Sequence, residues 1–192
     1  MRIDHVIYAA ADVDVAAARV GRELGLKATA GGRHQGHGTH NRIVPLGGGY
    51  LELLGVADAE QAANSDFGRG AMNHLALTGD GLLAWVVEVE DVDSVARRLG
   101  TTITTITRAG LSARLTGVAE AMREPFLPFF VSRDPGILDP GIECEAGGIT
   151  WIEVAGDAAR LRRWLDFAPL PVRVVDGSPA VLSVGIGECV LR

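Results

Sequence analysis

The feature that most constrains the fold of this chain is an internal repeat. The sequence ADVD at Ala11–Asp14 matches EDVD at Glu90–Asp93, and each copy follows an apolar segment that predicts a β-strand. Each copy also precedes a segment with apolar residues at helical spacing that ends in Leu-Gly, and glycine is the usual residue in the left-handed cap of a helix. Any strand–turn–helix unit gives a similar pattern, but here the order of the predicted strands after each helix also repeats. The sequence therefore predicts repeated βαβββ modules.

The repeat predicts the bounds of the modules. Module 1 covers residues 1–56, a linker of helix and loop covers 57–81, module 2 covers 82–133, and a partial third module covers 147–192. The predicted strands of the first two modules are 3–9, 26–30, 40–46, 50–55, 82–89, 101–107, 114–119 and 129–133, with a glycine-rich loop at 31–38. No long Pro- or Ser-rich segment separates the copies, so we expect a single domain over 1–192.

The composition limits the partners and the compartment. The formal net charge of -6 argues against a nucleic-acid partner. Cys144 and Cys189 form neither a CxxC pair nor a disulfide framework, which favours a reducing compartment. The amino-terminal MRIDHV lacks the regions of a signal peptide, and no apolar run approaches the roughly 18 residues that a spanning helix needs. We therefore expect a cytoplasmic protein that binds no membrane.

Two strand residues are the leading candidates for a site. His5 lies on the first predicted strand, and Glu52 lies in the apolar strand YLELLG. An unpaired carboxylate in apolar surroundings is costly, so Glu52 needs a partner, which could be a metal ion, His5 or an arginine such as Arg42. Both residues could bind a metal or act in proton transfer. The structural alternatives are a histidine bonded to a backbone carbonyl and a buried salt bridge.

Neighbouring polar residues extend this candidate site. His40 could join His5 and Glu52 as a third metal ligand, line a substrate pocket, or serve only as a hydrogen-bonded structural residue. Arg42 suits a substrate carboxylate because its guanidinium is planar, and Asn41 could bind a polar ligand or occupy a turn.

The remaining candidates have weaker patterns. His34 and His37 lie in the predicted glycine-rich loop, where they could bind an anion or a metal or simply contact solvent. His74 lies in a segment that resembles a strand and could supply a ligand. Cys144 lies between two glutamates, which raise the pKa of a thiol and make it a poor nucleophile. Five aromatic residues could line an apolar pocket, with Trp85 and Phe130 as the substrate-binding candidates, or pack in the core: Trp85, Phe126, Phe129, Phe130 and Trp151.

The opening IDHVIYAA and the segment GHGTHNRIVPLGGGYLELLGV at Gly36–Val56 resemble the glyoxalase-like domain proteins of the vicinal oxygen chelate superfamily. The likeness is closest over Met1–Val56 and looser over Leu82–Arg133. It implies an α+β fold in which repeated βαβββ modules form a cupped, mostly antiparallel sheet with helices on the outside. It also implies a divalent metal (Zn, Ni, Mn or Fe), bound from the first and fourth strands of each module, that chelates two neighbouring substrate oxygens. His5 and Glu52 match these positions in module 1.

Module 2 departs from the family pattern. Aligning Asp12 with Asp91 places Ala84 at the position of His5, and the position of Glu52 falls near Phe129 or Phe130. None of these side chains can bind a metal.

Two functional hypotheses follow from the resemblance. One is a metal-dependent lyase or isomerase, or an extradiol-type dioxygenase, that acts on a small substrate with adjacent oxygens. The other is a metal-free protein of the bleomycin-resistance type that binds a small molecule. Superfamily members often pair modules between chains, so a homodimer is an alternative to a cup formed within one chain.

Overall fold

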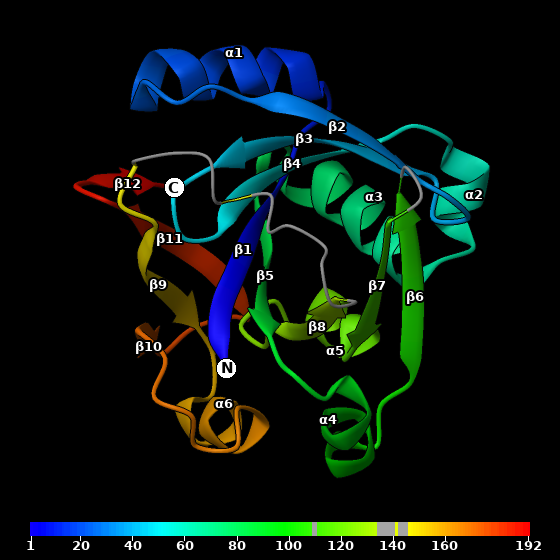
Figure 1. Ribbon diagram of the computed structural model, residues 1–192, viewed down its shortest axis with the longest axis vertical. Helices are drawn as coiled ribbons and strands as arrows, with labels where there is room; N and C mark the ends of the chain where they lie inside the picture. The colour runs from blue at the N-terminus through cyan, green and yellow to red at the C-terminus, as the bar shows by residue number, and fades with distance from the viewer. Residues whose placement is uncertain (109–110, 134–140, 142–145) are drawn as a thin grey trace.

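The computed structural model describes residues 1–108, 111–133, 141 and 146–192, which form two sheets and six helices (Figure 1). The strands are β1 (Arg2–Ala9), β2 (Thr29–His34), β3 (Thr39–Pro45), β4 (Tyr50–Val56), β5 (Gly81–Glu88), β6 (Ile103–Arg108), β7 (Leu111–Thr116), β8 (Phe129–Arg133), β9 (Ile149–Ala155), β10 (Val172–Val175), β11 (Ala180–Ile186) and β12 (Cys189–Leu191). The helices are α1 (Val13–Leu24), α2 (Ala59–Ala63), α3 (Asp66–Thr78), α4 (Val92–Leu99), α5 (Val118–Arg123) and α6 (Ala158–Trp164).

The larger sheet consists of two halves with the same topology. Its strand order is β2-β3-β4-β1-β5-β8-β7-β6. In each half the first strand pairs in parallel with the fourth, β1 with β4 and β5 with β8, and the antiparallel pair β1–β5 joins the halves. This arrangement confirms the predicted α+β class with repeated βαβββ modules.

The repeated sequence motif corresponds to repeated helix caps. Asp12 caps α1 by accepting hydrogen bonds from two backbone N–H groups, and Asp91 caps α4 in the same way through one. Gly25 and Gly100 end these helices in the left-handed conformation, with φ of 68° and 69°. The Leu-Gly sequences of the repeat therefore mark the ends of both helices, and the first aspartate of ADVD and of EDVD caps their starts.

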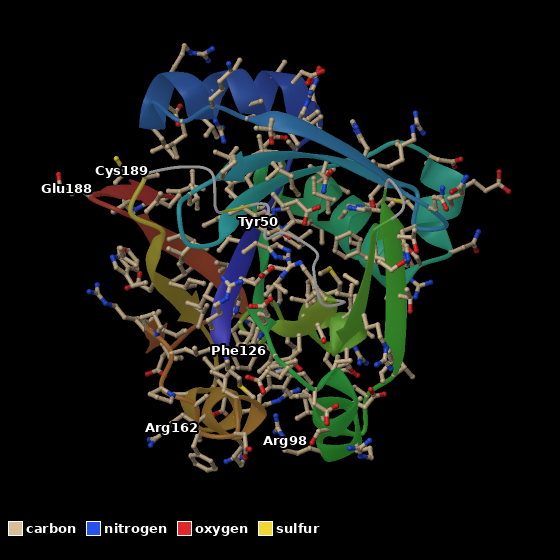
Figure 2. The ribbon with its side chains drawn as sticks, in the orientation of Figure 1. Tyr50, Arg98, Phe126, Arg162, Glu188 and Cys189 are labelled. Atoms are coloured by element: carbon tan, nitrogen blue, oxygen red, sulfur yellow. The ribbon has the colours of Figure 1, made fainter. Side chains whose placement is uncertain are left out.

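The two faces of the large sheet pack against different helices. On the outer face, α1, α4, α6 and the second sheet bury one apolar cluster. On the inner face, Phe67 and Ala71 of α3 and Val118 and Ala121 of α5 pack against residues of β1, β4, β5 and β8. Helices α1, α4 and α6 therefore cover the outer face, while α3 and α5 pack against the inner face. Figure 2 shows Tyr50 near the middle of the molecule and Arg98 of α4. Arg98 donates to the carbonyl oxygens of Arg163 and Trp164 at the end of α6.

Some predicted elements differ from those in the structure. The predicted loop at 31–38 contains the end of β2, because Arg33 and His34 pair with His40 and Thr39 of β3 beyond a register shift at the two glycines. His74 lies on α3 rather than on a strand, and the predicted strand 114–119 ends early because α5 begins at Val118. Beyond residue 146, β9 pairs with the next strand β10 in parallel and with β11 antiparallel, so this unit does not repeat the order of the first two. None of the helices in the described part of the chain has the length and apolar character needed to cross a bilayer.

Candidate functional site

Four polar side chains from four adjacent strands meet on the inner face. They are His5 of β1, His34 of β2, Asn41 of β3 and Glu52 of β4, and all four are buried. Strand pairing explains why they meet, because β1 and β4 run in parallel with Ile7 beside Glu52, and residues two apart share a face. The structure therefore brings together His5 and Glu52, which were the leading candidates from the sequence.

The Glu52 carboxylate lies between the two imidazole rings. Its Oε2 is 3.4 Å from Nε2 of His5, and its Oε1 is 3.5 Å from Nε2 of His34. The amide nitrogen of Asn41 donates to Oε1 of Glu52 and lies 3.2 Å from Nε2 of His34.

Backbone contacts define the orientation of the Asn41 amide. The N–H of Gly32 donates to Oδ1 of Asn41 at 2.9 Å, so the amide nitrogen, with its two hydrogens, faces Glu52 and His34. On the other side of the His34 ring, Nδ1 lies 2.9 Å from the hydroxyl of Thr39. With its proton assigned to Nδ1, the His34 ring donates to Thr39 and accepts from Asn41 at Nε2.

A second layer of charged groups supports His5. Nδ1 of His5 lies 2.5 Å from a carboxylate oxygen of Asp4, and Arg133 donates to both oxygens of Asp4 at 2.6 Å. Asp4 lies at a register shift between Ile3 and His5, a β-bulge that lets two consecutive side chains interact. The ring of Tyr50 stacks on His5 with centroids 4.3 Å apart. Asp4 and Arg133 are thus positioned to orient the His5 ring.

The environment shifts the pKa values of these groups. Burial alone would raise the pKa of Glu52, but hydrogen bonds from His5 and Asn41 outweigh it and lower the pKa to about 2. Burial opposes the charged form of His5 as well, yet its bonds to Asp4 and Glu52 raise its pKa. Burial would raise the pKa of Asp4 as well, but its hydrogen bonds with Arg133 and His5 hold this pKa well below its ordinary value. The cluster therefore favours two carboxylate anions facing a cationic imidazole and a guanidinium.

The side chains of the cluster fit a divalent metal in kind but not in arrangement. Two imidazoles and a carboxylate are suitable ligands, and bonds to Nδ1 from groups such as Asp4 and Thr39 are typical of metal sites. However, the amide hydrogens of Asn41 point at Nε2 of His34 and Oε1 of Glu52, the lone pairs that such an ion would need. Within 1–108, 111–133, 141 and 146–192, no three His, Cys, Asp or Glu side chains are placed to hold a metal.

Module 2 has no ligands at the equivalent positions. Ile7 lies beside Glu52 in the β1–β4 pair, and Val86 lies beside Phe129 in the β5–β8 pair. With the alignment of Asp12 and Asp91, Phe129 occupies the position of Glu52, and Ala84 that of His5. The apolar side chains expected there from the sequence are thus present, and Phe129 contacts the His5 ring edge-on with centroids 6.3 Å apart.

The structure does not bring His40 or Arg42 to this cluster, so the predicted ligand set needs correction. Both lie on β3 on either side of Asn41, and alternation turns them to the opposite face. Arg42 pairs with Asp14 of α1 at 2.7 Å, and His40 lines a shallow groove of about 250 Å³ beside it. His34, assigned to a loop from the sequence, is the second histidine at Glu52.

Trp85 and Phe130 do not line the site either. Both are fully buried in the outer-face core, where Nε1 of Trp85 donates to the carbonyl oxygen of Phe126 and Phe130 contacts Trp164. His74 lies on α3, where burial lowers its pKa. Cys144 falls outside the described residues.

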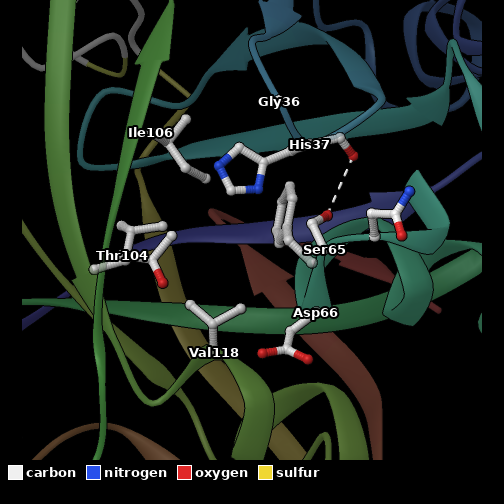
Figure 3. Close-up of a pocket in the computed structure, with 10 residues that line it drawn as sticks. Gly36, His37, Ser65, Asp66, Thr104, Ile106 and Val118 are labelled. Atoms are coloured by element: carbon white, nitrogen blue, oxygen red, sulfur yellow. Dashed lines mark hydrogen bonds between the residues drawn. The ribbon is translucent and has the colours of Figure 1, made fainter. Parts of the chain in front are cut away.

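A cavity of about 280 Å³ adjoins the cluster (Figure 3). Its lining comes from the β2–β3 turn, the start of α3 and the second half of the sheet: Gly36, His37, Asn64, Ser65, Asp66, Phe67, Thr104, Ile106, Leu115 and Val118. Phe67 lines the cavity, and its ring contacts His34 with centroids 5.8 Å apart, so this side chain lies against both. The hydroxyl of Ser65 donates to the backbone oxygen of His37, which fixes the turn against α3.

The sequence interpretation missed Asp4, Tyr50 and Arg133. Asp4 directly precedes His5, but regular alternation would place neighbouring residues on opposite faces, and the bulge cannot be recognised from the sequence. Arg133 is 129 residues from Asp4, so only the pairing of β5 with β8 brings them together.

Replacing Gly31 with alanine should destabilise the protein by about 1–3 kcal/mol, because the added methyl would overpack the strand pair. A Cβ at Gly31 would lie too close to two atoms of Asn41: 2.0 Å from its backbone oxygen and 2.2 Å from its Oδ1. Urea unfolding would measure the change. Gly21→Ala in α1 is the control, since its Cβ would meet only one atom, at 3.4 Å, and alanine favours helix. Equal midpoints for the two variants would contradict the close packing around Asn41.

Comparisons with known proteins agree with this fold. One solved structure, a hypothetical protein from Staphylococcus aureus, has a TM-score of 0.70 at 15% identity, covering 98% of this chain and 96% of that one. Methylmalonyl-CoA epimerase from Mycobacterium tuberculosis has a TM-score of 0.51 at 20% identity, covering 71% and 89%. The Streptomyces coelicolor methylmalonyl-CoA epimerase in complex with 2-nitronate-propionyl-CoA has a TM-score of 0.52 at 20% identity, covering 69% and 97%. At these identities the likeness shows the fold alone.

The sequence itself gives the family. No curated protein matches the chain. The model of the glyoxalase-like domain matches residues 3–167, which include the whole cluster and both modules. The chain therefore belongs to the glyoxalase-like domain family, within the vicinal oxygen chelate superfamily.

Proposed function

We propose that this protein is an isomerase or lyase that moves a proton on a carbon next to a carbonyl group of a small molecule. The observation that carries the proposal is the buried pair of Glu52 and His5, 3.4 Å apart, with Asp4 and Arg133 behind the imidazole. Buried ionisable groups with shifted pKa values and specific partners are typical of catalytic sites.

The pair can supply both the base and the acid. Glu52 takes the proton from the carbon, the C–H electron pair forms the C=C bond of an enol, and the carbonyl oxygen receives the proton from Nε2 of His5. When His5 gives up its proton, Glu52 loses its cationic neighbour and becomes more basic, which offsets its low resting pKa. When Glu52 returns its proton to an enol carbon and His5 takes back the hydroxyl proton, the C=O bond re-forms and an isomerisation is complete. When a group on the neighbouring carbon departs with its bonding pair instead, His5 again takes the hydroxyl proton, and the result is a lyase reaction.

Asp4 and Arg133 are positioning residues in this proposal. The carboxylate of Asp4 accepts from Nδ1 of His5, which keeps Nε2 directed at Glu52 and stabilises the imidazolium. Because Asn41 hydrogen-bonds to the groups that a divalent ion would need, no step of the proposed reaction involves Zn, Ni, Mn or Fe.

Exchange of substrate protons with deuterated water tests the proposal. We would follow α-hydroxyaldehydes, 2-oxo acids and acyl thioesters by NMR, the last because solved relatives are named methylmalonyl-CoA epimerases. We expect exchange in one class, reduced about 10²–10⁴-fold in Glu52→Gln because the base is lost. Glu60→Gln, at an exposed position of α2, is the control and should exchange at the wild-type rate.

Other outcomes of this experiment would contradict the proposed isomerase or lyase activity. Binding of a compound without exchange, detected as a thermal shift, would favour the second candidate, a metal-free binding protein of the bleomycin-resistance type. The aromatic wall of Phe67 and Phe129, whose rings lie 6.2 Å apart, is the observation that favours this candidate. The cytoplasmic location and the homodimer that we expect from the sequence belong to the proposal, and fractionation and light scattering would test them.

A further inference from the structure

We infer that Asn41 takes the place of a divalent cation in this cluster, so that the wild-type protein assembles its His–His–Glu site without a metal. The inference concerns the same cluster as the proposed function, but it is tested by metal binding, whereas the proposed function is tested by proton exchange. The inference and the proposed function can therefore fail independently of each other.

The first step of the argument is the position of the Asn41 amide. Its nitrogen donates to Oε1 of Glu52 and lies 3.2 Å from Nε2 of His34, while these two acceptors are themselves 3.5 Å apart. One N–H₂ group has two hydrogens, so it can satisfy both acceptors at once. A cation bound by His34 and Glu52 would need the same two lone pairs.

The second step is that the amide cannot easily turn over. Reversing it would replace the donor by an oxygen that faces a carboxylate oxygen, and would point N–H₂ at the N–H of Gly32. Gly32 belongs to a register shift of β2 between Ala30 and Arg33, which moves this backbone N–H onto Oδ1 of Asn41. The neighbouring Gly31 leaves room for the close approach, because a Cβ there would lie 2.2 Å from Oδ1.

The third step is that both imidazole rings are already oriented by partners at Nδ1, with Nε2 of each ring directed at Glu52. The partner of His5 is Asp4, and the partner of His34 is Thr39. Position 41 is therefore the one that decides whether an ion can bind. An aspartate there would remove the competing donor and add an anionic ligand of nearly the same shape.

The experiment measures binding of Zn²⁺, Mn²⁺ and Co²⁺ to untagged wild type, Asn41→Asp and Asn73→Asp by titration calorimetry, with the visible absorption of Co²⁺ as a second readout. Asn73 is exposed on α3, so it is a matched control for the same chemical change. We expect one ion per Asn41→Asp chain, bound at least about tenfold more tightly than by the other two proteins. Circular dichroism would check folding, and Asn41→Ser, which removes the amide but adds no charge, should also bind more tightly than wild type.

Two results would overturn the inference. One is a stoichiometric ion in wild type whose affinity is unchanged in Asn41→Asp and Asn41→Ser. The other is the absence of binding in both folded variants, which would show that Asn41 is not what excludes the ion. Proton exchange by metal-free wild type would support the proposed function whichever result is found.

Discussion

Arg133→Met should lower the free energy of unfolding by about 3–5 kcal/mol, because it removes the guanidinium that bonds to both oxygens of the buried Asp4 carboxylate. Asp4 is completely buried, and Arg133 donates to both of its oxygens at 2.6 Å. Methionine preserves much of the apolar stem of arginine, so the loss reports mainly on the charge and its hydrogen bonds. Urea unfolding at pH 7 would measure the change.

The chain offers a matched control for this variant. Arg114 and Asp93 form the same two-pronged pair, at 2.6 and 2.7 Å, but both side chains are exposed. Arg114→Met should leave the unfolding midpoint almost unchanged, because water solvates the remaining carboxylate. If Arg133→Met were equally harmless, Asp4 would have to be satisfied by other groups, and the support proposed for His5 would be wrong.

Wild-type stability should fall steeply as the pH drops from about 5 to 2. The folded state lowers the pKa of Glu52 from 4.5 to about 2, so its contribution is present above pH 4.5 and is lost as the pH falls through about 2. A shift of this size corresponds to about 3 kcal/mol. The contribution of His5 to stability depends on pH in the opposite direction. Because folding raises the pKa of His5, its stabilisation is present below pH 6.5 and is lost as the pH rises through its pKa in the folded state. We therefore expect a stability maximum in the weakly acidic range.

Glu52→Gln should flatten the acid limb of this profile, since glutamine does not titrate. Urea midpoints measured at intervals between pH 2 and 8 would show the change. Glu60→Gln, at an exposed position of α2, should preserve the wild-type profile. An acid limb of the same slope in Glu52→Gln would mean that other carboxylates, Asp4 among them, account for the acid sensitivity.

Local chemistry made part of the fold predictable. The caps at Asp12, Gly25, Asp91 and Gly100 depend only on neighbouring backbone groups, so the repeat located both helices and the strands that precede them. His5 and Glu52 could be recognised because a polar side chain in an apolar strand requires a partner. The family resemblance then implied a cupped sheet in which the first and fourth strands carry these two residues.

Contacts that are distant in the sequence determined the rest. His34 rather than His40 reaches Glu52, because the pairing of β2 with β3 and β3 with β4 decides which side chains face inward. The bulges at Asp4 and at Gly31–Gly32 depend on the neighbouring strands, and so does the placement of α3 and α5 on the inner face.

The sequence by itself determined the modules, their caps and the two central residues of the candidate site, because these follow from interactions within a few residues. Only the tertiary structure decided that Asn41 and His34 complete the cluster and that Arg133 neutralises Asp4 from 129 residues away. The physical reason is strand register, because a shift of one residue turns a side chain to the opposite face, and register depends on the pairing of whole strands.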